Sequence, residues 1–278
     1  MTENYRIHAL VTGETESTLG LILLNEARAL NLPSEKVLPY GWQERIDHGN
    51  GVFAAGVMAP VYAWLIEGPG EPLLVDTGLP PCDELHQVIS SQGGEIKPCR
   101  QEPEWRLDRQ LRRLGIDPGD IRTVVLTHLH GDHYGGNEFF PNARFIVHEA
   151  EIPLCLGAPP WAPFYRPGFA HRLRSVLGRV ETVSASVNLR PGIELVHVGG
   201  HSPGLLAVVV QTSLGQAAIA SDLVYSYRNL ELNWPVGSFW DLRQLTESMR
   251  RLAGQAEIIL PSHDRELLQR FPDGVIGR

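Results

Sequence analysis

Four side chains of the kinds that bind metal ions occur within six residues near the middle of the chain. Because side chains alternate along extended backbone, His128 and His130 point the same way and can share one cation. Asp132 and His133 follow where the strand 123–127 should end, and they can face a second cation. Imidazole nitrogen and carboxylate oxygen suit zinc, iron or manganese. The run therefore predicts half of a two-metal site, and a polar loop with chance histidines is the alternative.

Three further apolar stretches are each expected to form a strand, and each is followed closely by another residue that can bind a metal. Glycine and proline near two of these strand ends predict tight loops. Each residue also has an ordinary structural role open to it, as a loop histidine or as an aspartate that caps a helix. Their joint occurrence favours a second set of ligands. The stretches are 193–198 before His201, 217–220 before Asp222, and 257–260 before His263.

The order of these seven residues resembles the signature of the metallo-β-lactamase superfamily, in which His-x-His-x-Asp-His precedes a lone His, a lone Asp and a last His. The resemblance implies an α/β fold, the αβ/βα four-layer sandwich, with two divalent metal ions at one sheet edge. Zinc is the expected metal, and iron and manganese are the alternatives. The implied ligands are His128, His130 and His201 for the first metal, Asp132, His133 and His263 for the second, and Asp222 as the bridge.

An aspartate upstream of the ligands is expected to support them. The segments 61–66 and 72–78 resemble the early hairpin of the superfamily, whose aspartate lies behind the metal histidines. Asp76 is therefore expected to orient one ligand imidazole through the nitrogen that does not bind metal. A turn aspartate before Gly78 is the alternative. Residues 1–60 match the superfamily poorly and are read as an N-terminal extension of the same domain.

Within the superfamily, the segment 221–225 resembles the N-acyl-homoserine lactone lactonases, in which a tyrosine follows the bridging aspartate by three residues. This resemblance runs from about Val61 to the C-terminus. It implies that Tyr225 contacts the bound carbonyl, and the alternatives are a packed aromatic or the same role for Tyr227. The chain departs from the best-known quorum-quenching lactonases at Gly131, where they carry a bulky apolar residue that helps line the substrate channel.

The resemblance implies a dinuclear-metal hydrolase that opens the ester bond of an N-acyl-homoserine lactone or a related small lactone. Two cations that share one water lower its pKa, so that a metal-bridging hydroxide can attack the carbonyl. Asp132 and Tyr225 are the expected catalytic residues, Asp132 as proton shuttle and Tyr225 as donor to the oxyanion. A thioester hydrolase of the glyoxalase II kind, with the same seven ligands, is the alternative function.

The composition agrees with one enzyme domain over residues 1–278. The chain is 43% hydrophobic, and the expected ligands from 128 to 263 tie it into a single unit. The net charge of -8 and the lack of a clear basic face argue against nucleic acid as a partner. No apolar run is long enough to cross a membrane, and the longest early one, 19–24, is followed by charged residues. The N-terminus lacks the order of a signal peptide, so a cytoplasmic location is expected.

Two helices are expected from apolar residues at helical spacing. The first spans 104–114, with an inward stripe of Leu107, Leu111 and Leu114 and a solvated face of Arg106, Arg109, Arg112 and Arg113. The second spans 242–252, with Leu242, Leu245, Met249 and Leu252 facing inward and Asp241 paired with Gln244 at its start.

The segment 158–169 is rich in proline and aromatic residues. It is expected to be either a lid over the metals or an ordered surface loop that could serve as a contact in a homodimer. Trp161, Phe164 and Tyr165 are its candidate substrate contacts. The three cysteines fall outside every ligand position and are read as unpaired thiols, with a bridge between Cys82 and Cys99 as the alternative.

Overall fold

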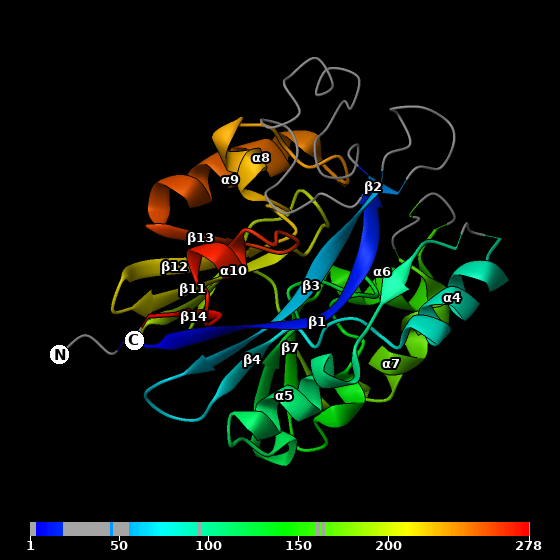
Figure 1. The fold of residues 1–278 in the computed structure, drawn as a ribbon, viewed down its shortest axis with the longest axis horizontal. Helices are drawn as coiled ribbons and strands as arrows, with labels where there is room; N and C mark the ends of the chain where they lie inside the picture. The colour runs from blue at the N-terminus through cyan, green and yellow to red at the C-terminus, as the bar shows by residue number, and fades with distance from the viewer. Residues whose placement is uncertain are drawn as a thin grey trace.

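The computed structural model describes residues 4–18, 45–46, 56–93, 96–159, 162 and 165–277. Two β-sheets lie face to face in the middle of the molecule, and helices cover the outer face of each sheet (Figure 1). This arrangement confirms the αβ/βα four-layer sandwich. The expected substrate contacts Trp161 and Phe164, and the apolar run 19–24, lie outside the described residues.

The larger sheet contains the early hairpin and the strand that precedes the histidine run. Its main strand order is β14-β1-β3-β4-β6-β7-β8, with β2 paired to β3 and β5 paired to β1. Strands β4, β6, β7 and β8 are parallel, so their carboxyl ends meet at one edge. The strands are β1 (Arg6–Thr18), β2 (Arg45–Ile46), β3 (Gly56–Glu67), β4 (Leu73–Val75), β5 (Cys99–Arg100), β6 (Thr123–Val125), β7 (Arg144–His148), β8 (Val180–Val183) and β14 (Val275–Ile276).

The smaller sheet carries the strands that precede the remaining ligand-type residues. Its order is β13-β12-β11-β10-β9, and among the described strands of this sheet β12 and β13 form a parallel pair, whereas the other pairs are antiparallel. These two strands therefore also end at a common edge. The strands are β9 (Val187–Arg190), β10 (Ile193–His197), β11 (Leu206–Thr212), β12 (Gly215–Ser221) and β13 (Ile258–Pro261).

The helices form the two outer layers, with α4 to α7 over the larger sheet and α8 and α9 over the smaller one (Figure 1). The helices are α4 (Cys82–Ser91), α5 (Leu107–Arg113), α6 (Glu151–Gly157), α7 (Ala170–Arg174), α8 (Tyr227–Glu231), α9 (Leu242–Gln255) and α10 (Leu267–Arg270). Short 3-10 helices are η2 (Pro103–Trp105), η3 (Pro118–Asp120), η4 (Asn137–Phe139), η5 (Pro167–Phe169) and η6 (Leu177–Arg179). No helix of the described residues is long and apolar enough to cross a membrane.

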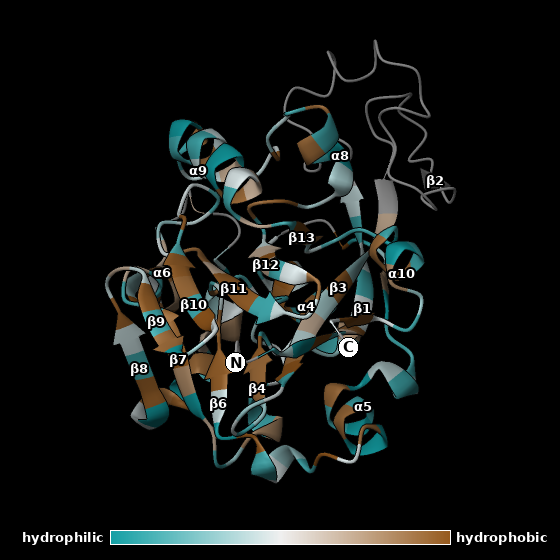
Figure 2. Ribbon diagram, turned by 90° about the vertical axis from the view of Figure 1, so that its left-hand side faces the viewer, coloured by the Kyte–Doolittle hydropathy of each residue, from teal (hydrophilic) through white to brown (hydrophobic). Residues whose placement is uncertain are grey.

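The core between the sheets is built from side chains that point inward from both. Trp64 and Ile66 of β3 pack with Val208 of β11 and Ile219 of β12 in one buried cluster. Figure 2 shows that the apolar colouring is concentrated on the strands, whereas α5 and α9 carry much hydrophilic colouring. Burial of these side chains is what holds the sheet edges, and the loops that leave them, in fixed positions.

The first expected helix, 104–114, is shorter in the structure than its periodicity suggested. It begins at Leu107, after the 3-10 turn η2, and ends at Arg113. Leu114 is 41% exposed because it follows the last helical turn, so the inward stripe is only Leu107 and Leu111. Arg106 and Arg112 pair with Asp108 at the surface, as a solvated face requires.

The second expected helix is longer, since α9 continues from Leu242 to Gln255. The Asp241 side chain caps it by accepting a hydrogen bond from the Gln244 backbone N–H at 2.9 Å. Leu242 is 36% exposed and does not belong to the inward stripe, because it stands in the first turn. Leu245 and Met249 do face the core, together with Leu252.

Cys82 and Cys99 form a disulfide, so the reading of these two cysteines as unpaired thiols is wrong. The bridge arises because β5 returns alongside β1 and brings Cys99 to the start of α4, where Cys82 lies. Spacing of 17 residues in the sequence does not reveal this return. Cys155 is a buried free thiol, as expected.

Candidate metal centre

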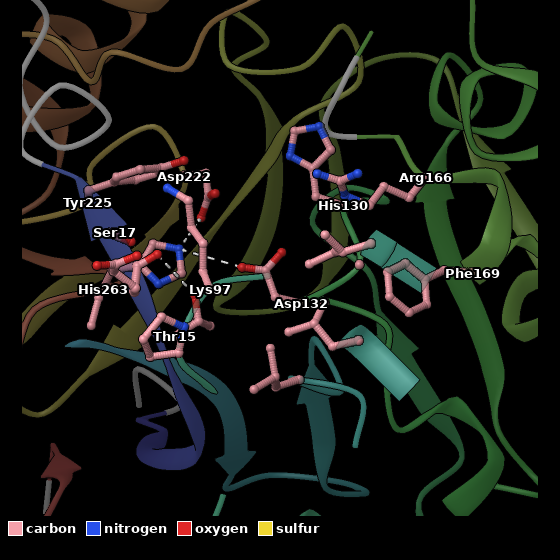
Figure 3. Close-up of a pocket in the computed structure, with 17 residues that line it drawn as sticks. Thr15, Ser17, Lys97, His130, Asp132, Arg166, Phe169, Asp222, Tyr225 and His263 are labelled. Carbon is pink, nitrogen blue, oxygen red and sulfur yellow. Dashed lines mark hydrogen bonds and ion pairs between the residues drawn. The ribbon is translucent and has the colours of Figure 1, made fainter. Parts of the chain in front are cut away.

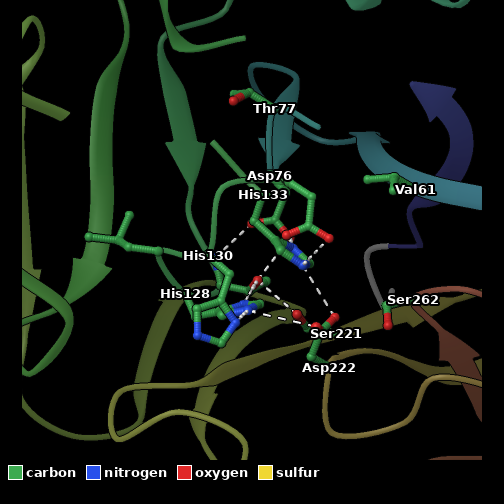
Figure 4. Close-up of polar contacts among 12 residues, drawn as sticks. Val61, Asp76, Thr77, His128, His130, His133, Ser221, Asp222 and Ser262 are labelled. Carbon is green, nitrogen blue, oxygen red and sulfur yellow. Dashed lines mark hydrogen bonds and ion pairs between the residues drawn. The ribbon is translucent and has the colours of Figure 1, made fainter. Parts of the chain in front are cut away.

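Seven side chains from four loops converge at the common edge of the two sheets. They fall into two groups, and in each group the potential ligand atoms all lie within 4.8 Å of one another. The loops follow β6, β10, β12 and β13, and Figure 4 shows several of these side chains pointing toward one another. The groups are His128, His130, His201 and Asp222 in the first, and Asp132, His133 and His263 in the second.

The first group is a cluster of three buried imidazoles. The Nδ1 atom of His130 lies 3.0 Å from the Nε2 atom of His128 and 3.0 Å from that of His201. Burial lowers the pKa of all three rings, well below the ordinary value for His128 and His130. The imidazoles are therefore neutral near pH 7, which is the form that binds a metal ion.

The second group places two imidazoles beside two carboxylates. The Nε2 atoms of His133 and His263 lie 3.8 and 4.0 Å from Oδ2 of Asp132. The same two nitrogens lie 3.2 and 3.3 Å from Oδ1 of Asp222. The other oxygen of Asp222, Oδ2, lies 3.3 Å from Nε2 of His201. Asp222 therefore divides its oxygens between the two groups, as a bridging carboxylate does.

The charges and unsatisfied atoms of the site fit two cations. Nε2 of His133 and Oδ1 of Asp222 are buried, and neither has a hydrogen-bond partner within the described part of the chain. Burial acts to lower the pKa of His133, but Asp222, Asp132 and Asp76 outweigh it and raise that pKa well above its ordinary value. The buried carboxylates thus demand positive charge beside them, which a divalent ion supplies.

The outer ring nitrogens of three histidines are held by acceptors. Nδ1 of His201 is 2.8 Å from the Ser238 carbonyl, and Nδ1 of His263 is 2.9 Å from the Pro60 carbonyl. Nδ1 of His133 is 2.8 Å from Oδ2 of Asp76. Each acceptor requires a proton on Nδ1, and this leaves the Nε2 lone pair free to face the centre.

Asp76 lies behind His133, where the sequence led us to expect it. Its carboxylate also accepts hydrogen bonds from the backbone N–H and the hydroxyl of Thr127, at 2.7 and 2.8 Å. Asp76 and Ser221 have φ values of 58° and 48°, an unfavourable conformation for residues with side chains. The surrounding hydrogen bonds hold this strain, which is typical of functional sites.

The histidine run differs from expectation in one local detail. Strand β6 ends at Val125, so His128 and His130 follow the strand instead of lying on it. One further hydrogen bond, from Leu126 N–H to the Ile146 carbonyl, continues the pairing beyond the strand end. The two imidazoles nevertheless meet, because the segment leaves the sheet edge directly beside the neighbouring ligand loops.

Sequence reasoning missed Glu151, which connects the loops that carry the ligands. Its fully buried carboxylate accepts hydrogen bonds from the N–H groups of Leu129 and Gly204, at 3.0 and 2.8 Å, and from the Tyr165 hydroxyl at 2.8 Å. Leu129 separates the first two histidines of the run, and Gly204 follows His201. The sequence did offer one signal for Glu151. It lies three residues beyond the end of β7, the parallel neighbour of β6, and therefore at the same sheet edge as the histidine run.

A cavity of about 210 Å³ opens above the metal-ligand groups. His130, Asp132 and Asp222 form part of its floor (Figure 3). Its walls come from β1, α4, the segment before β5 and the segment around η5. The residues that line it are Thr15, Glu16, Ser17, Ala59, Leu79, Leu85, Ile89, Lys97, Pro98, His130, Gly131, Asp132, Arg166, Phe169, Asp222, Tyr225 and His263.

Tyr225 faces this cavity and Tyr227 does not. The Tyr225 ring lies 4.8 Å from the His263 ring and 5.8 Å from the His201 ring, measured between centroids. Burial and the neighbouring Asp222 raise its pKa well above the ordinary value, so its hydroxyl keeps its proton. Tyr227 is absent from the cavity lining, and the Arg270 guanidinium lies 3.6 Å from its ring centroid.

The position of Tyr165 does not support its expected substrate contact. Its ring packs edge-on against the His130 ring at 4.6 Å, and it is absent from the cavity lining. Its hydroxyl is engaged by Glu151, which holds it behind the ligand. Phe169, from the same segment, does line the cavity and covers Gly131. A Cβ atom added at Gly131 would lie 2.8 Å from Cδ2 of the Phe169 ring.

Comparison with known proteins agrees with this geometry. The family model described as the metallo-beta-lactamase superfamily matches residues 57–263. An N-acyl homoserine lactonase of Bacillus cereus is 30% identical over 216 residues, covering 74% of this chain and 82% of that protein.

Solved structures share the fold over most of the chain. An N-acyl homoserine lactone hydrolase with the product N-hexanoyl-L-homoserine bound at its catalytic metal center has a TM-score of 0.75 at 22% identity, and the match covers 97% of each chain. AidC, a dizinc quorum-quenching lactonase, has a TM-score of 0.68 at 17% identity, covering 95% of this chain and 90% of that one. With the family model matched across both ligand groups, the chain belongs to the metallo-beta-lactamase superfamily.

Proposed function

We propose that the protein is a dinuclear-metal hydrolase that opens the ester bond of an N-acyl homoserine lactone or a related small lactone. The relatives named as lactonases support this substrate class. The observation that carries the proposal is the division of Asp222 between the two ligand groups, directly beneath a cavity that Tyr225 also lines. A carbonyl placed in that cavity meets both ligand groups and a phenol donor.

We assign the first ion to His128, His130 and His201, the second to Asp132, His133 and His263, and the bridge to Asp222. Bound there, two divalent ions would lower the pKa of a water molecule and polarise the scissile carbonyl. The ligand atoms are nitrogen and oxygen only, a set that suits zinc, and one structural neighbour is a dizinc enzyme. Zinc is therefore the proposed metal, and iron and manganese are the alternatives to be excluded by elemental analysis.

The remaining chemistry belongs to side chains of the chain itself. Tyr225 keeps its proton and can donate it in a hydrogen bond to the oxyanion that forms from the lactone carbonyl. The side chain of Asp132 is 29% exposed toward the cavity, unlike the 3% of Asp222. Asp132 can therefore take up the proton that the attacking water loses and pass it to the leaving alkoxide. Because the alkoxide stays attached to the acyl product in a lactone, the product is one hydroxy acid.

The test is incubation of the metal-loaded protein with lactones that vary in ring size and acyl chain. Mass spectrometry should show the gain of one water and no second organic product, with release of one proton per turnover at neutral pH. A thioester such as an acylglutathione serves as the competing substrate class. Intact lactones together with rapid thioester hydrolysis would replace the lactonase proposal with the glyoxalase II alternative.

We further propose that residues 1–278 act as one domain on a small-molecule substrate and not on nucleic acid. A homodimer remains a prediction for sedimentation analysis. The cytoplasmic location also remains a prediction, and the Cys82–Cys99 bridge weighs against it, because disulfides persist mainly in oxidising compartments. Thiol trapping of the protein in its native cell tests this: two alkylated cysteines in addition to Cys155 would favour the reducing cytoplasm.

A further inference from the structure

Two cationic side chains line the cavity, and the proposed mechanism uses neither. Lys97 precedes β5, and Arg166 precedes η5. Figure 3 shows Lys97 on the side of the cavity with Tyr225 and His263, and Arg166 on the side with His130 and Phe169. The only partner of the Arg166 guanidinium in the described part of the chain is uncharged: it donates to Oε1 of Gln92 at 3.2 Å.

The setting of Arg166 differs from that of a structural arginine nearby. Arg172 is more deeply buried than Arg166, and it forms ion pairs with Glu84 and Glu138, which raise its pKa. Burial lowers the pKa of Arg166, and no carboxylate of the described residues offsets that cost. A partly desolvated guanidinium that has no carboxylate beside it can form an ion pair with an anionic group of a ligand.

Helix α4 contacts the backbone of Lys97, and the residue that follows α4 contacts the guanidinium of Arg166. His86 contacts the Lys97 carbonyl through Nε2 at 3.1 Å, and the disulfide ties the start of the helix to the segment just beyond Lys97. Gln92, at the other end of α4, receives the Arg166 hydrogen bond. The residues that carry the two cations are thus both tied to one helix, which lowers the cost of ordering them when they bind a ligand.

The surface of the cavity beside the two cations is apolar. Leu85 and Ile89 of α4 contribute to it, and Phe169 contributes from η5. A ligand that extends away from the metal centre therefore meets apolar side chains as well as a positive charge. Glu16 also lines the cavity, and its backbone N–H donates a hydrogen bond to the carbonyl of Pro98, the residue after Lys97. An anion is therefore better placed at Arg166 than at Lys97.

We propose that the natural substrate carries a carboxylate remote from the scissile ester, which Arg166 binds with help from Lys97. This inference rests on the proposed lactonase function and refines its substrate class. An acyl chain that ends in a carboxylate can pack against the apolar side chains and can also pair its charge with the guanidinium. A neutral acyl chain can pack against the apolar side chains but leaves the guanidinium without a counter-charge.

The experiment compares homoserine lactones whose acyl chains of four to ten carbons end either in a carboxylate or in a carboxamide of the same shape. A charge-assisted hydrogen bond is worth about 1.5–3 kcal/mol, so the wild-type kcat/KM should favour the carboxylate about tenfold or more at the best chain length. Arg166→Gln should bring the ratio close to one. The loss should fall mainly on kcat/KM for the carboxylate, because the carboxamide carries no charge for Arg166 to bind.

Lys97→Gln should lower the ratio of kcat/KM for the carboxylate to kcat/KM for the carboxamide only in part. Arg243→Gln is the matched control for net charge, since Arg243 is 88% exposed on α9 and pairs with Glu247 away from the cavity. It should keep the full preference. The affinity of the hydroxy acid product, measured by calorimetry, gives a readout independent of turnover and should show the same loss in Arg166→Gln.

Two failures are distinguishable. Equal hydrolysis of carboxylate and carboxamide lactones at every chain length, or an unchanged preference in Arg166→Gln, overturns the carboxylate inference and leaves the lactonase proposal intact. Hydrolysis of neither lactone by metal-loaded protein overturns the proposed function, and the inference falls with it.

Discussion

The floor and the wall of the cavity are built in different ways. The floor, defined here as the seven metal-ligand side chains, comes from loops at the ends of neighbouring strands, and six of these residues are buried. The wall, defined as Leu85, Ile89, Lys97, Arg166 and Phe169, comes from a helix and two irregular segments, and most of it is partly exposed. The floor is suited to fixed chemistry, and the wall is suited to a choice of substrate.

The hydrogen bonds reinforce this contrast. Asp76, Ser238 and Pro60 each fix the outer nitrogen of one floor histidine. The wall has fewer such bonds, and the cation Arg166 depends on the single side chain of Gln92. Changes in the floor should therefore reduce metal binding and kcat together, whereas changes in the wall should act mainly on KM and on the preference between substrates.

The largest effect is expected at the residue shared by both halves of the floor. Asp222→Asn keeps the size of the side chain but removes the charge that both ligand groups face. Metal content should fall below two ions per chain, and kcat should fall on the order of 10³ or more. Elemental analysis and steady-state kinetics measure both. Asp273→Asn, an exposed acid outside the cavity, is the charge control, and two retained ions with normal kcat in Asp222→Asn would contradict the bridging assignment.

The next effect concerns a donor above the floor that belongs to neither ligand group. Tyr225→Phe keeps the buried ring and removes only the hydroxyl, so the fold and metal content should survive. Loss of one oxyanion donor costs on the order of 10² to 10³ in kcat, and a metal can cover part of it. We expect a decrease of about tenfold to a hundredfold. Tyr227→Phe should leave kcat unchanged, because Tyr227 is outside the cavity. Equal kcat in both variants would assign Tyr225 to packing.

Glu151→Gln tests how far the floor depends on its supporting loops. The Leu129 N–H bonds to Oε2 of Glu151 and the Gly204 N–H bonds to Oε1. The amide replaces one of these acceptor oxygens with a donor NH2 group, so the side chain can no longer accept both hydrogen bonds. Loss of such outer support typically weakens metal binding, here by about tenfold. Glu149→Gln, an exposed neighbour in the same segment, should have no effect on metal affinity in a chelator competition. The same affinity in both variants would show that the loops hold without Glu151.

Much of the floor could be predicted from sequence because its residues are chemically distinctive and follow recognisable strands. A histidine or aspartate after an apolar run is visible without coordinates, and parallel strands bring such residues to one edge. Tyr225 was visible only through resemblance to lactonases, since a tyrosine near a strand end has no unique role.

The wall could not be predicted because its residues have no pattern of their own. Lys97 and Arg166 stand in irregular segments, and only the tertiary structure places both beside α4. Glu151 was missed for a related reason, since its partners are backbone N–H groups of loops distant in sequence. The disulfide depends on the return of β5 to the start of α4, which no local periodicity encodes.

The smallest effect is expected where the floor and the wall touch. Gly131 lies between the floor residues His130 and Asp132, and an added Cβ would lie 2.8 and 2.9 Å from two ring atoms of Phe169, closer than ordinary contacts allow. In Gly131→Ala the ring must move, because the backbone is held by the ligands on either side. Overpacking of this kind lowers the free energy of unfolding by about 1 kcal/mol or more. Because the displaced ring lines the cavity, kcat/KM should fall roughly three- to tenfold, with metal content unchanged.

The double variant Gly131→Ala with Phe169→Leu should recover most of that loss, because the smaller side chain clears the space. Gly157→Ala is the control, since a Cβ added at Gly157 would meet no described residue within 4 Å. Calorimetry of the metal-loaded variants and the kcat/KM for lactones of increasing acyl length give the two readouts. If Gly131→Ala instead releases a metal ion, the substitution has displaced the metal ligands. The floor and the wall would then not be structurally independent.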